Sequence, residues 1–243
     1  MTRVEAGGVL FEVEAVAFDK DGTLIDLDAA WGPAAQSWVE TAGDGDVGLV
    51  QDLAAKLGLD LETGRLVTGG IFAVGTVGQL YETTLAVLSG HGLDEAKAQQ
   101  AASVARTKSA LAGEAGNLVP LGDVAGTFSA LKEAGLRLAV VSSDDRTAVD
   151  SAVVALGIGD LLDAVVSGDE GLAPKPAPDT LREAARRMGV EPARMLYVGD
   201  SWVDAAAGRA AGVAGMVLVG DPPPEARELA AAVVPGVDRL RVV

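Results

Sequence analysis

The feature that most constrains the fold of this chain is a repeated alternation of short apolar runs with Ala-rich segments of helical period. Each run contains β-branched residues and ends in Gly, Ser or Asp, and a helical segment that closes on Gly follows it. The runs occupy residues 14–19, 137–143, 164–169, 195–200 and 215–220. Because they are apolar on both faces, they suit parallel strands with helices on each side. The alternation predicts a doubly wound α/β domain with a mainly parallel sheet.

The helices between these runs have recognisable ends. Asp123 stands where an N-cap belongs, and Gly135 stands where a helix-terminating glycine belongs. Further helices are expected over residues 144–156, 179–188 and 202–211, and each is followed by Gly.

Residues 28–116 break this rhythm. They are helical in pattern, with no convincing strand, and they separate the first apolar run from the second. Helices are expected over residues 29–41, 48–57, 74–89 and 94–112. We therefore predict an all-helical domain at 28–116, inserted into a core domain that comprises residues 1–27 and 117–243.

Composition and charge exclude several classes of partner and site. With 35 acidic and 19 basic side chains the chain has a formal net charge of −16, which repels nucleic acid and anionic membranes. The absence of Cys excludes disulfides, thiolate metal sites and a Cys nucleophile. His91 is the only histidine and is expected at a helix end rather than in a metal site. A small phosphorylated substrate remains compatible, since a bound cation and one Lys can reverse the potential inside a cleft.

The sequence shows no signal that directs the chain into a membrane. Residues 1–8 lack the apolar core of a secretion signal, and no stretch approaches ~18 consecutive apolar residues. We expect a cytoplasmic protein, either a monomer or a homodimer.

The first chemical motif is Asp19-Lys20-Asp21-Gly22-Thr23, at the end of the first apolar run. Ligands bind beyond the carboxyl ends of strands in open α/β sheets, so both carboxylates can face one site. Two carboxylates this close repel each other unless a cation lies between them or one holds a proton. Either arrangement suits phosphoryl transfer, with Mg²⁺ neutralising Asp19 and a protonated Asp21 serving the leaving oxygen. The alternative is a turn that Asp favours for structural reasons.

A second acidic pair and a lysine add to this motif. Asp200 ends the fourth run, and Asp204 lies one helical turn later on the same side. Asp200 can ligate a metal, or it can cap the helix that follows. Lys175 stands between Pro174 and Pro176, and a fixed ammonium there can bind a phosphate oxygen.

Ser142 and Ser143 end the second run, and their hydroxyl and N–H groups can hold phosphate oxygens. In chain order, DKDGT, a strand ending in Ser, a Lys between prolines and GDSWVD resemble the four motifs of the haloacid dehalogenase superfamily. The resemblance covers residues 13 to about 220. It implies a Rossmann-like core, and the insert at 28–116 is similar to that of the helical-cap branch, which includes phosphoglycolate phosphatases.

The resemblance implies roles for the acidic residues. Asp19 would be the nucleophile, and Asp21 would be the general acid and later the base that activates water. Mg²⁺ would be held by Asp19, Asp200 and the backbone carbonyl of Asp21. Dehalogenases and phosphonate-cleaving members of the family lack an acid at the position of Asp21, so its presence favours phosphate chemistry.

The resemblance also implies roles for the polar residues. Ser142, Ser143 and Lys175 would bind the phosphoryl group, and Asp204 would orient Lys175 or a metal-bound water. The remaining supporting residues would be Gly22 and Thr23. The second motif departs from the family pattern, because many relatives have Asn after its hydroxyl residue and this chain has Ser143 followed by Asp144.

Substrate specificity is expected in the inserted domain. The segment that we nominate contains Arg65, Thr68, Gly69 and Gly70. Arg can bind a carboxylate or a second phosphate, and glycines allow close approach. The alternative is a plain turn between helices.

We expect a Mg²⁺-dependent phosphatase that hydrolyses a small phosphate monoester, such as a phosphoglycolate-like acid or a sugar phosphate, through an aspartyl phosphate. One alternative is a β-phosphoglucomutase-like phosphomutase, which would pass the group to a sugar. A second is a receiver-type signalling domain, which also uses clustered Asp, a hydroxyl residue, a Lys and Mg²⁺, but Asp21 and the helical insert argue against it. A catalytically inactive scaffold would not require Asp19, Asp21, Lys175 and Asp200 together.

Overall fold

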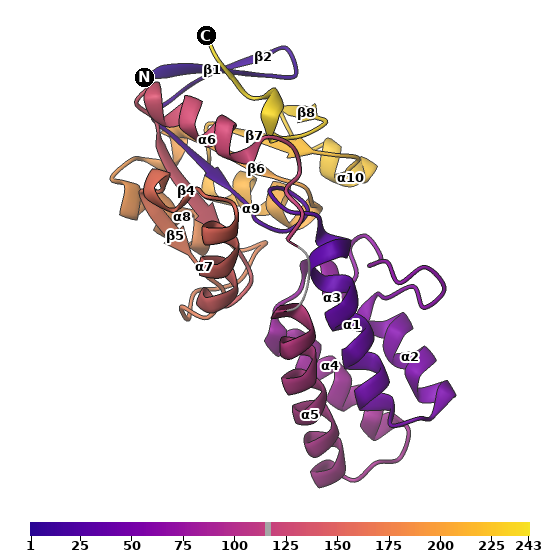
Figure 1. Cartoon of the computed structure of the whole chain (residues 1–243). Coiled ribbons are helices and arrows are strands. Elements are labelled where there is room, and N and C mark those ends of the chain that lie inside the picture. Colours follow the sequence, from indigo (N-terminus) through magenta and orange to yellow (C-terminus); the bar gives the residue numbers. More distant parts are fainter. Residues whose placement is uncertain (115–117) are drawn as a thin grey trace. The chain divides into compact units, whose positions relative to one another are not determined.

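The structure of the chain, a computed structural model, describes residues 1–114 and 118–243. It contains two compact units, one formed by Met1–Asp26 with Pro120–Val243 and the other by Leu27–Val119. We call the first the core unit and the second the helical unit, and Figure 1 shows the elements of each. The domain boundary predicted between residues 116 and 117 lies outside the described residues.

The core unit contains a six-stranded parallel sheet in the order β5-β4-β3-β6-β7-β8. The chain enters this sheet at β3, adds β4 and β5 on one side, and then crosses to add β6, β7 and β8 on the other. This order confirms the predicted doubly wound, parallel α/β fold. The strands are β3 (Ala15–Phe18), β4 (Arg137–Val141), β5 (Ala164–Val166), β6 (Met195–Gly199), β7 (Gly215–Val219) and β8 (Ala232–Val234).

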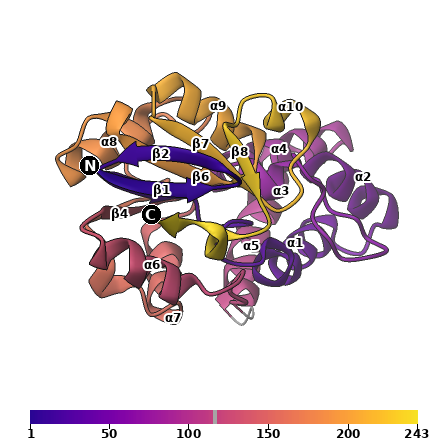
Figure 2. The same ribbon diagram turned by 90° about the horizontal axis from the view of Figure 1, so that it is seen from above.

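Helices cover both faces of this sheet, which is why its strands are apolar on both sides. On one face, Tyr197 of β6 and Leu181 of α8 belong to one buried cluster. On the other face, the ring of Phe18 lies 4.5 Å from that of Phe128 in α6, measured between ring centroids. Figure 2 shows α8, α9 and α10 on one side of the strands, with α6 and α7 on the other. The helices are α6 (Val124–Glu133), α7 (Arg146–Ala155), α8 (Asp179–Met188), α9 (Trp202–Ala211) and α10 (Pro224–Arg227), with short 3₁₀ helices at Gly159–Leu161, Pro192–Arg194 and Val237–Arg239.

Side-chain caps stand at the starts of α6, α7 and α9. Asp123 caps α6 as predicted, and α8 and α9 occupy the residues predicted for them. The helix predicted over 144–156 begins only at Arg146, because the Asp145 side chain accepts a hydrogen bond from the first turn and caps it.

A second, antiparallel sheet has the strand order β2-β1-β9. Its first two strands precede the parallel sheet along the chain, and its third strand follows it. β1 (Thr2–Ala6) and β2 (Val9–Val13) form a hairpin, and β9 (Arg241–Val242) pairs with β1. The two turn residues are Gly7 and Gly8, with φ of 58° and 82°, a backbone that Gly adopts without a Cβ clash. This hairpin lies before the predicted runs, which begin at residue 14; Gly-Gly between two alternating segments was the signal for it.

The helical unit is built around its own buried cluster. The indole nitrogen of Trp38 donates a hydrogen bond of 2.9 Å to the Thr84 hydroxyl inside it. His91 ends a helix, as predicted, and its ring nitrogen lies 2.7 Å from an Asp52 oxygen. The cluster includes Ala35, Trp38, Val39, Leu53, Leu57, Phe72, Leu80, Leu88, Ala102 and Ala105. The helices are α1 (Leu27–Gly43), α2 (Val47–Leu57), α3 (Ile71–Val74), α4 (Val77–Gly90) and α5 (Glu95–Glu114).

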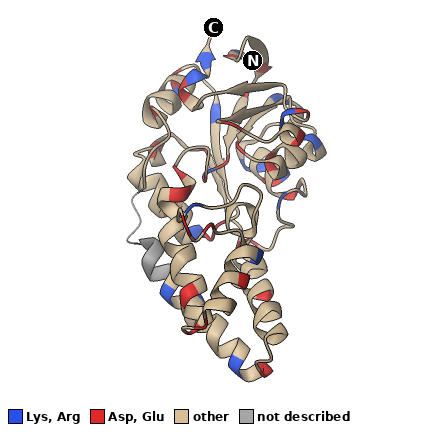
Figure 3. Cartoon of the chain, turned by 90° about the vertical axis from the view of Figure 1, so that its right-hand side faces the viewer, with Lys and Arg blue, Asp and Glu red and all other residues tan. Residues whose placement is uncertain are grey.

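Charge is distributed over both units. Figure 3 shows acidic and basic positions on the ribbons of each, so neither sign of charge is confined to one of them. Among the helices that the structure describes, none combines the length and the apolar character needed to cross a bilayer.

Candidate active site

The motif residues lie at the carboxyl ends of β3, β4 and β6, which are neighbours in the middle of the sheet. Between β3 and β6 the chain reverses the direction in which it adds strands. Open α/β sheets bind their ligands at such switch points. The topology therefore brings the segments after Phe18, Val141 and Gly199 to one edge of the sheet.

The turn after β3 holds the first motif in place. Asp19 donates its backbone N–H to the carbonyl of Val198, at 2.8 Å, so the β3–β6 pairing continues into the motif. Gly22 has φ of +75°, and a Cβ at this position would overlap the carboxylate of Asp200. Glycine is therefore required both for the turn and for the close approach of the β6 loop.

Lys175 lies between two of the predicted site carboxylates. Its Nζ is 2.5 Å from Asp19 Oδ1 and 2.7 Å from Asp204 Oδ1, and it donates to the Tyr197 hydroxyl at 3.3 Å. The Lys175 side chain is only 5% exposed. Burial alone would lower the pKa of Lys175, but Asp19 and Asp204 raise it well above its ordinary value. Lys175 is therefore a fixed, buried cation beside the proposed nucleophile.

The pKa values of the carboxylates of the site are shifted in different directions. Burial raises the pKa of Asp19 to about 7, against the attraction of Lys175. It also raises the pKa of Asp200 well above its ordinary value, and repulsion from Asp204 and Asp19 adds to this. For Asp204 burial acts in the same sense, but Lys175 and several hydrogen bonds lower its pKa overall. Asp204 is thus the ionised counter-charge of Lys175, an ammonium that it shares with Asp19.

The acidic cluster fits a metal ion. Asp19, Asp200 and Asp204 each offer a carboxylate oxygen within 4.8 Å of the others. Asp204 is committed elsewhere, since its Oδ1 accepts from Lys175 and Tyr197 and its Oδ2 accepts from Ser201. Asp19 and Asp200 are then the carboxylates suited to a divalent cation, whose charge would offset the burial and the mutual repulsion that raise their pKa values.

The carboxylate of Asp21 pairs with a lysine. Its carboxylate is not part of the acidic cluster found among the described residues. Instead, Asp21 Oδ1 lies 2.7 Å from the Nζ of Lys20, and the same ammonium lies 2.8 Å from Asp144 Oδ2. Burial raises the pKa of Asp144 to about 7. A role of Asp21 in metal binding through its backbone carbonyl stays a prediction.

The loop after β4 brings the predicted serines to the same edge. Ser142 is buried, donates its backbone N–H to Val166 and accepts a hydrogen bond of 3.1 Å on its hydroxyl from the Asp144 N–H. Ser143 is half-buried. On β6, Asp200 is not the N-cap of α9, because Ser201 takes that role, and Thr23 Oγ1 is 3.5 Å from Asp200 Oδ1. The binding of phosphate by Ser142 and Ser143 stays a prediction.

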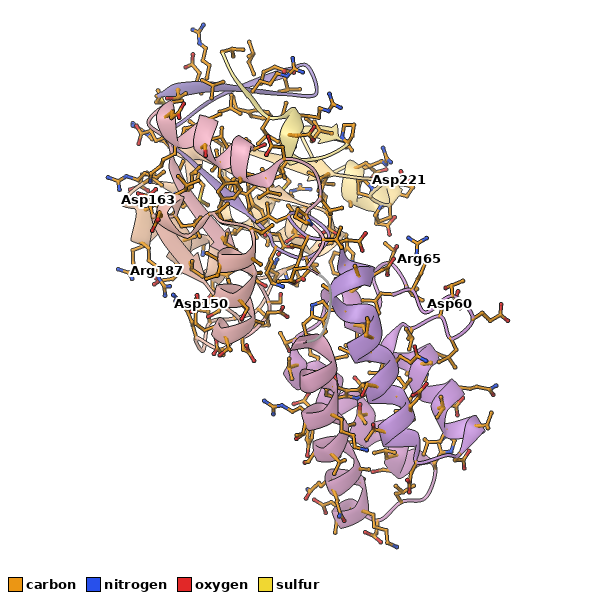
Figure 4. All side chains as sticks on the ribbon, viewed as in Figure 1. Asp60, Arg65, Asp150, Asp163, Arg187 and Asp221 are labelled. Carbon is orange, nitrogen blue, oxygen red and sulfur yellow. The ribbon has the colours of Figure 1, made fainter. Side chains whose placement is uncertain are left out.

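The predicted specificity residues lie in the loop between α2 and α3 of the helical unit. Arg65 Nε is 2.8 Å from Asp28 Oδ2, and Asp28 Oδ1 accepts from the N–H of Leu66 at 2.8 Å. Thr68 and Gly69 are exposed in the same loop, and Gly69 has φ of +78°. Figure 4 labels Arg65 together with Asp60 of this loop. Asp28 thus holds the loop to the start of α1, and the role of these residues toward a substrate stays a prediction.

Four residues of the site were not nominated from the sequence: Lys20, Asp144, Tyr197 and Ser201. Each contacts a predicted site residue: Lys20 contacts Asp21, the N–H of Asp144 donates to Ser142, and Tyr197 and Ser201 contact Asp204. A lysine between two Asp and a lone tyrosine in an aliphatic strand were visible signals. The pairing of Lys20 with Asp144 was not visible, because these two residues are far apart along the chain.

Comparisons with known proteins agree with this architecture. A family model described as haloacid dehalogenase-like hydrolase matches residues 13–212. A phosphoglycolate phosphatase of Escherichia coli K12 is 42% identical over 89 residues, which are 37% of this chain and 35% of that protein. The matched segments span between 35% and 43% of the length of such curated relatives.

Solved structures share the fold. A protein from Haemophilus somnus, described as a predicted phosphoglycolate phosphatase, superposes with a TM-score of 0.68 at 20% identity, over 93% of this chain and 95% of its own. A hydrolase of the haloacid dehalogenase family from Deinococcus radiodurans, with bound phosphate and sodium, has a TM-score of 0.60 at 24% identity, over 93% of both chains.

Proposed function

This chain belongs to the haloacid dehalogenase-like hydrolase family, and we propose that it is a Mg²⁺-dependent phosphatase that hydrolyses a small phosphate monoester through an aspartyl phosphate on Asp19. The observation that carries the proposal is the setting of Asp19. It is buried at a strand end, 2.5 Å from the ammonium of Lys175, and one of its carboxylate oxygens lies within 4.8 Å of one of Asp200, close enough for both to bind one metal ion.

In the first step, a carboxylate oxygen of Asp19 attacks the phosphorus of the ester, and the bond from phosphorus to the leaving oxygen breaks. Lys175 stabilises the phosphoryl oxygens and keeps Asp19 ionised. The carboxyl group of Asp21 gives its proton to the leaving oxygen, so an alcohol departs and Asp21 becomes a carboxylate.

In the second step, the Asp21 carboxylate takes a proton from a water molecule as that water attacks the phosphorus. The bond between phosphorus and the Asp19 oxygen breaks, which releases inorganic phosphate and restores the carboxylate of Asp19. Asp21 again holds the proton it gave away, so the cycle closes.

Asp19 and Asp200 would hold the divalent cation, and the backbone carbonyl of Asp21 would be a further ligand. When bound, the cation supplies charge neutralisation between these carboxylates and the phosphate dianion. Asp204 does not take this role in the proposal, because it holds Lys175 in position.

A phosphoglycolate-like acid or a sugar phosphate is the substrate class that we propose. The curated relative named above is a phosphoglycolate phosphatase, and the formal net charge of −16 favours small substrates over polyanions. Arg65 and the adjacent Gly69 are the residues that we propose for specificity, since a guanidinium binds carboxylates well.

The test compares Asp19→Asn and Asp21→Asn on an aryl phosphate and an alkyl phosphate. Asp19→Asn should abolish phosphoenzyme formation with both. Asp21→Asn should hydrolyse the alkyl phosphate roughly 10²- to 10⁴-fold more slowly, since this is the usual rate contribution of a general acid. An aryl oxide leaves without a proton, so this variant should accumulate phosphorylated Asp19, detectable by mass spectrometry of acid-quenched protein.

Two results would contradict the proposal: a label on a residue other than Asp19, or an Asp21→Asn variant that turns over both substrates at the parent rate. Asp145→Asn is the matched control, because Asn caps α7 as well as Asp does. Release of inorganic phosphate without an added sugar separates a phosphatase from a phosphomutase.

A further inference from the structure

We propose that Lys20 is a positioning residue: its ammonium, held between Asp144 and Asp21, fixes the Asp21 carboxylate in the orientation that proton transfer requires. This inference rests on the proposed function, which gives Asp21 the task of acid and base.

Lys20 is buried and forms ion pairs with two carboxylates. Its side chain is 4% exposed, and its Nζ lies 2.7 Å from Asp21 Oδ1 and 2.8 Å from Asp144 Oδ2. An ammonium has three donors and no acceptor, so burial is tolerated only when carboxylates or other acceptors surround it. With its charge directed at two carboxylates and almost no exposure, Lys20 acts inside the protein and not as a surface contact for substrate.

The anchor of this ammonium is rigid. Asp144 lies in the loop after β4, where its backbone N–H donates to the Ser142 hydroxyl at 3.1 Å. The carbonyl of Asp144 accepts from the N–H of Gly168 at 2.6 Å, which ties the loop to the segment after β5. These contacts fix the backbone of Asp144, whose carboxylate forms the ion pair with Lys20, and Lys20 in turn contacts Asp21.

Asp19 and Asp21, the two carboxylates of the first motif, therefore contact different lysines. Lys175 contacts Asp19 and Asp204, whereas Lys20 contacts Asp21 and Asp144. This division suits separate tasks, since a nucleophile must stay ionised and an acid must aim at the leaving oxygen. A displacement of about 1 Å at a reacting group can cost about 10²-fold in rate.

The competing explanation is that Lys20 only neutralises the buried carboxylate of Asp144. The two explanations differ in their dependence on the leaving group. Removal of a purely structural lysine lowers the hydrolysis of alkyl and aryl phosphates equally, because it changes the folded fraction or the whole site. Removal of a lysine that positions the acid lowers hydrolysis of the alkyl phosphate more, because only that substrate needs the proton in the first step.

The experiment measures kcat/KM for an alkyl and an aryl phosphate in the parent protein and in Lys20→Met, which keeps the chain length and removes the charge. We expect the ratio of alkyl to aryl kcat/KM to fall by about ten-fold or more. Phosphorylated Asp19 should also accumulate with the aryl substrate, since its hydrolysis needs the same residue as base.

A second variant guards against loss of folding. Lys20→Met leaves Asp144 buried without its cation, so the double variant Lys20→Met/Asp144→Asn removes that charge as well. The double variant should fold and keep the lowered ratio, because Asp21 still lacks its anchor. Asp145→Asn removes the neighbouring carboxylate without a contact to Lys20 and should leave the ratio unchanged.

Equal losses on both substrates, or a parental ratio in the double variant, would overturn the proposal and leave Lys20 as the neutraliser of Asp144. A parent protein that hydrolyses neither phosphate would instead refute the proposed function, and the inference with it. Because the parent is measured first, the two failures are distinguishable.

Discussion

Tyr197 brings a hydroxyl into β6, a strand whose other residues are Met, Leu, Val and Gly. Burial raises the pKa of Tyr197 well above its ordinary value, so the hydroxyl keeps its proton. It donates that proton to Asp204 Oδ1 at 2.7 Å, the same oxygen that accepts from Lys175. The network fixes the counter-charge of Lys175 and, through it, the ammonium beside Asp19.

Tyr197→Phe should lower stability by roughly 1.5–3 kcal/mol, the usual value for a hydrogen bond to a charged group. Turnover of an aryl phosphate should fall only several-fold, because Lys175 and Ser201 still hold Asp204. Urea unfolding and steady-state kinetics measure the two effects. Tyr81→Phe, which removes a hydroxyl hydrogen-bonded to Ser103 at an exposed site, should change neither. A loss of activity beyond about 10²-fold would show that the Tyr197 hydroxyl takes part in the chemistry itself.

The raised pKa of Asp19 makes metal binding depend on pH. Its pKa is about 7 in the folded protein, against an ordinary value of 3.8, so between these values the folded state binds more protons than the unfolded state. The unfolding free energy of the metal-free protein therefore decreases as pH rises from 3.8 to about 7. Mg²⁺ binds the ionised carboxylate, so below about 7 it has to displace a proton.

We expect saturating Mg²⁺ to raise the unfolding temperature more at about pH 8 than at about pH 5.5. Thermal unfolding with and without a chelator at each pH measures this difference. Asp200→Asn should abolish the Mg²⁺-dependent shift at both pH values. A shift that is independent of pH, or that persists in Asp200→Asn, would place the cation elsewhere.

At the scale of single elements, the first turn of α9 couples helix formation to the site. Ser201 accepts from the N–H of Asp204 at 3.3 Å, and the Asp204 carboxylate accepts from the N–H of Ser201 at 3.3 Å, which completes a capping box. The residue that stabilises the start of the helix is therefore the one that holds Lys175. Local helix capping and the placement of the Lys175 ammonium depend on one side chain, that of Asp204.

Ser201→Ala should cost about 1 kcal/mol of stability, as the loss of an N-cap does elsewhere. It should also reduce kcat for an aryl phosphate several-fold, because Asp204 loses a partner and Lys175 becomes less fixed. Asp46→Ala removes the N-cap of α2 in the helical unit and is the matched control. It should cost similar stability with no change in kcat, and equal effects of the two variants on kcat would refute the coupling.

At the scale of the whole molecule, the two units have separate hydrophobic clusters. One contains residues of β3, β4, β6, α8 and α9, and the other contains residues of α1, α2, α4 and α5. The chain leaves and re-enters the core unit at neighbouring points, since Ile25 forms an antiparallel bridge with Pro120 and Leu121 donates to the carbonyl of Leu24 at 2.9 Å. A short connection can therefore replace everything between these points.

Replacing residues 27–119 with a Gly/Ser linker should leave a folded core unit. We expect cooperative urea unfolding with a smaller slope, in proportion to the surface buried, and hydrolysis of an aryl phosphate with altered substrate range. Circular dichroism and urea titration provide the measurement. A core that fails to fold would show that the helical unit supplies part of its hydrophobic core.

The sequence alone determined the features that depend on neighbouring residues. Apolar runs on both faces predicted the parallel sheet, and the capping residues Asp123 and Gly212 predicted where α6 begins and where α9 ends. These signals are local, because helical period, strand alternation and capping involve residues within about four positions of each other. The order of the motifs along the chain was equally readable, and it indicated the family to which the chain belongs.

Tertiary structure decided which side chains meet. Lys20 and Asp144 are 124 residues apart and Lys175 and Asp19 are 156 apart, so no local pattern indicates that they form ion pairs. The strand order brings such distant residues together. β3 lies between β4 and β6, and the segments after these strands meet at one edge of the sheet. The same physical reason explains why β9 was missed, since β9 finds its partner β1 at the opposite end of the chain.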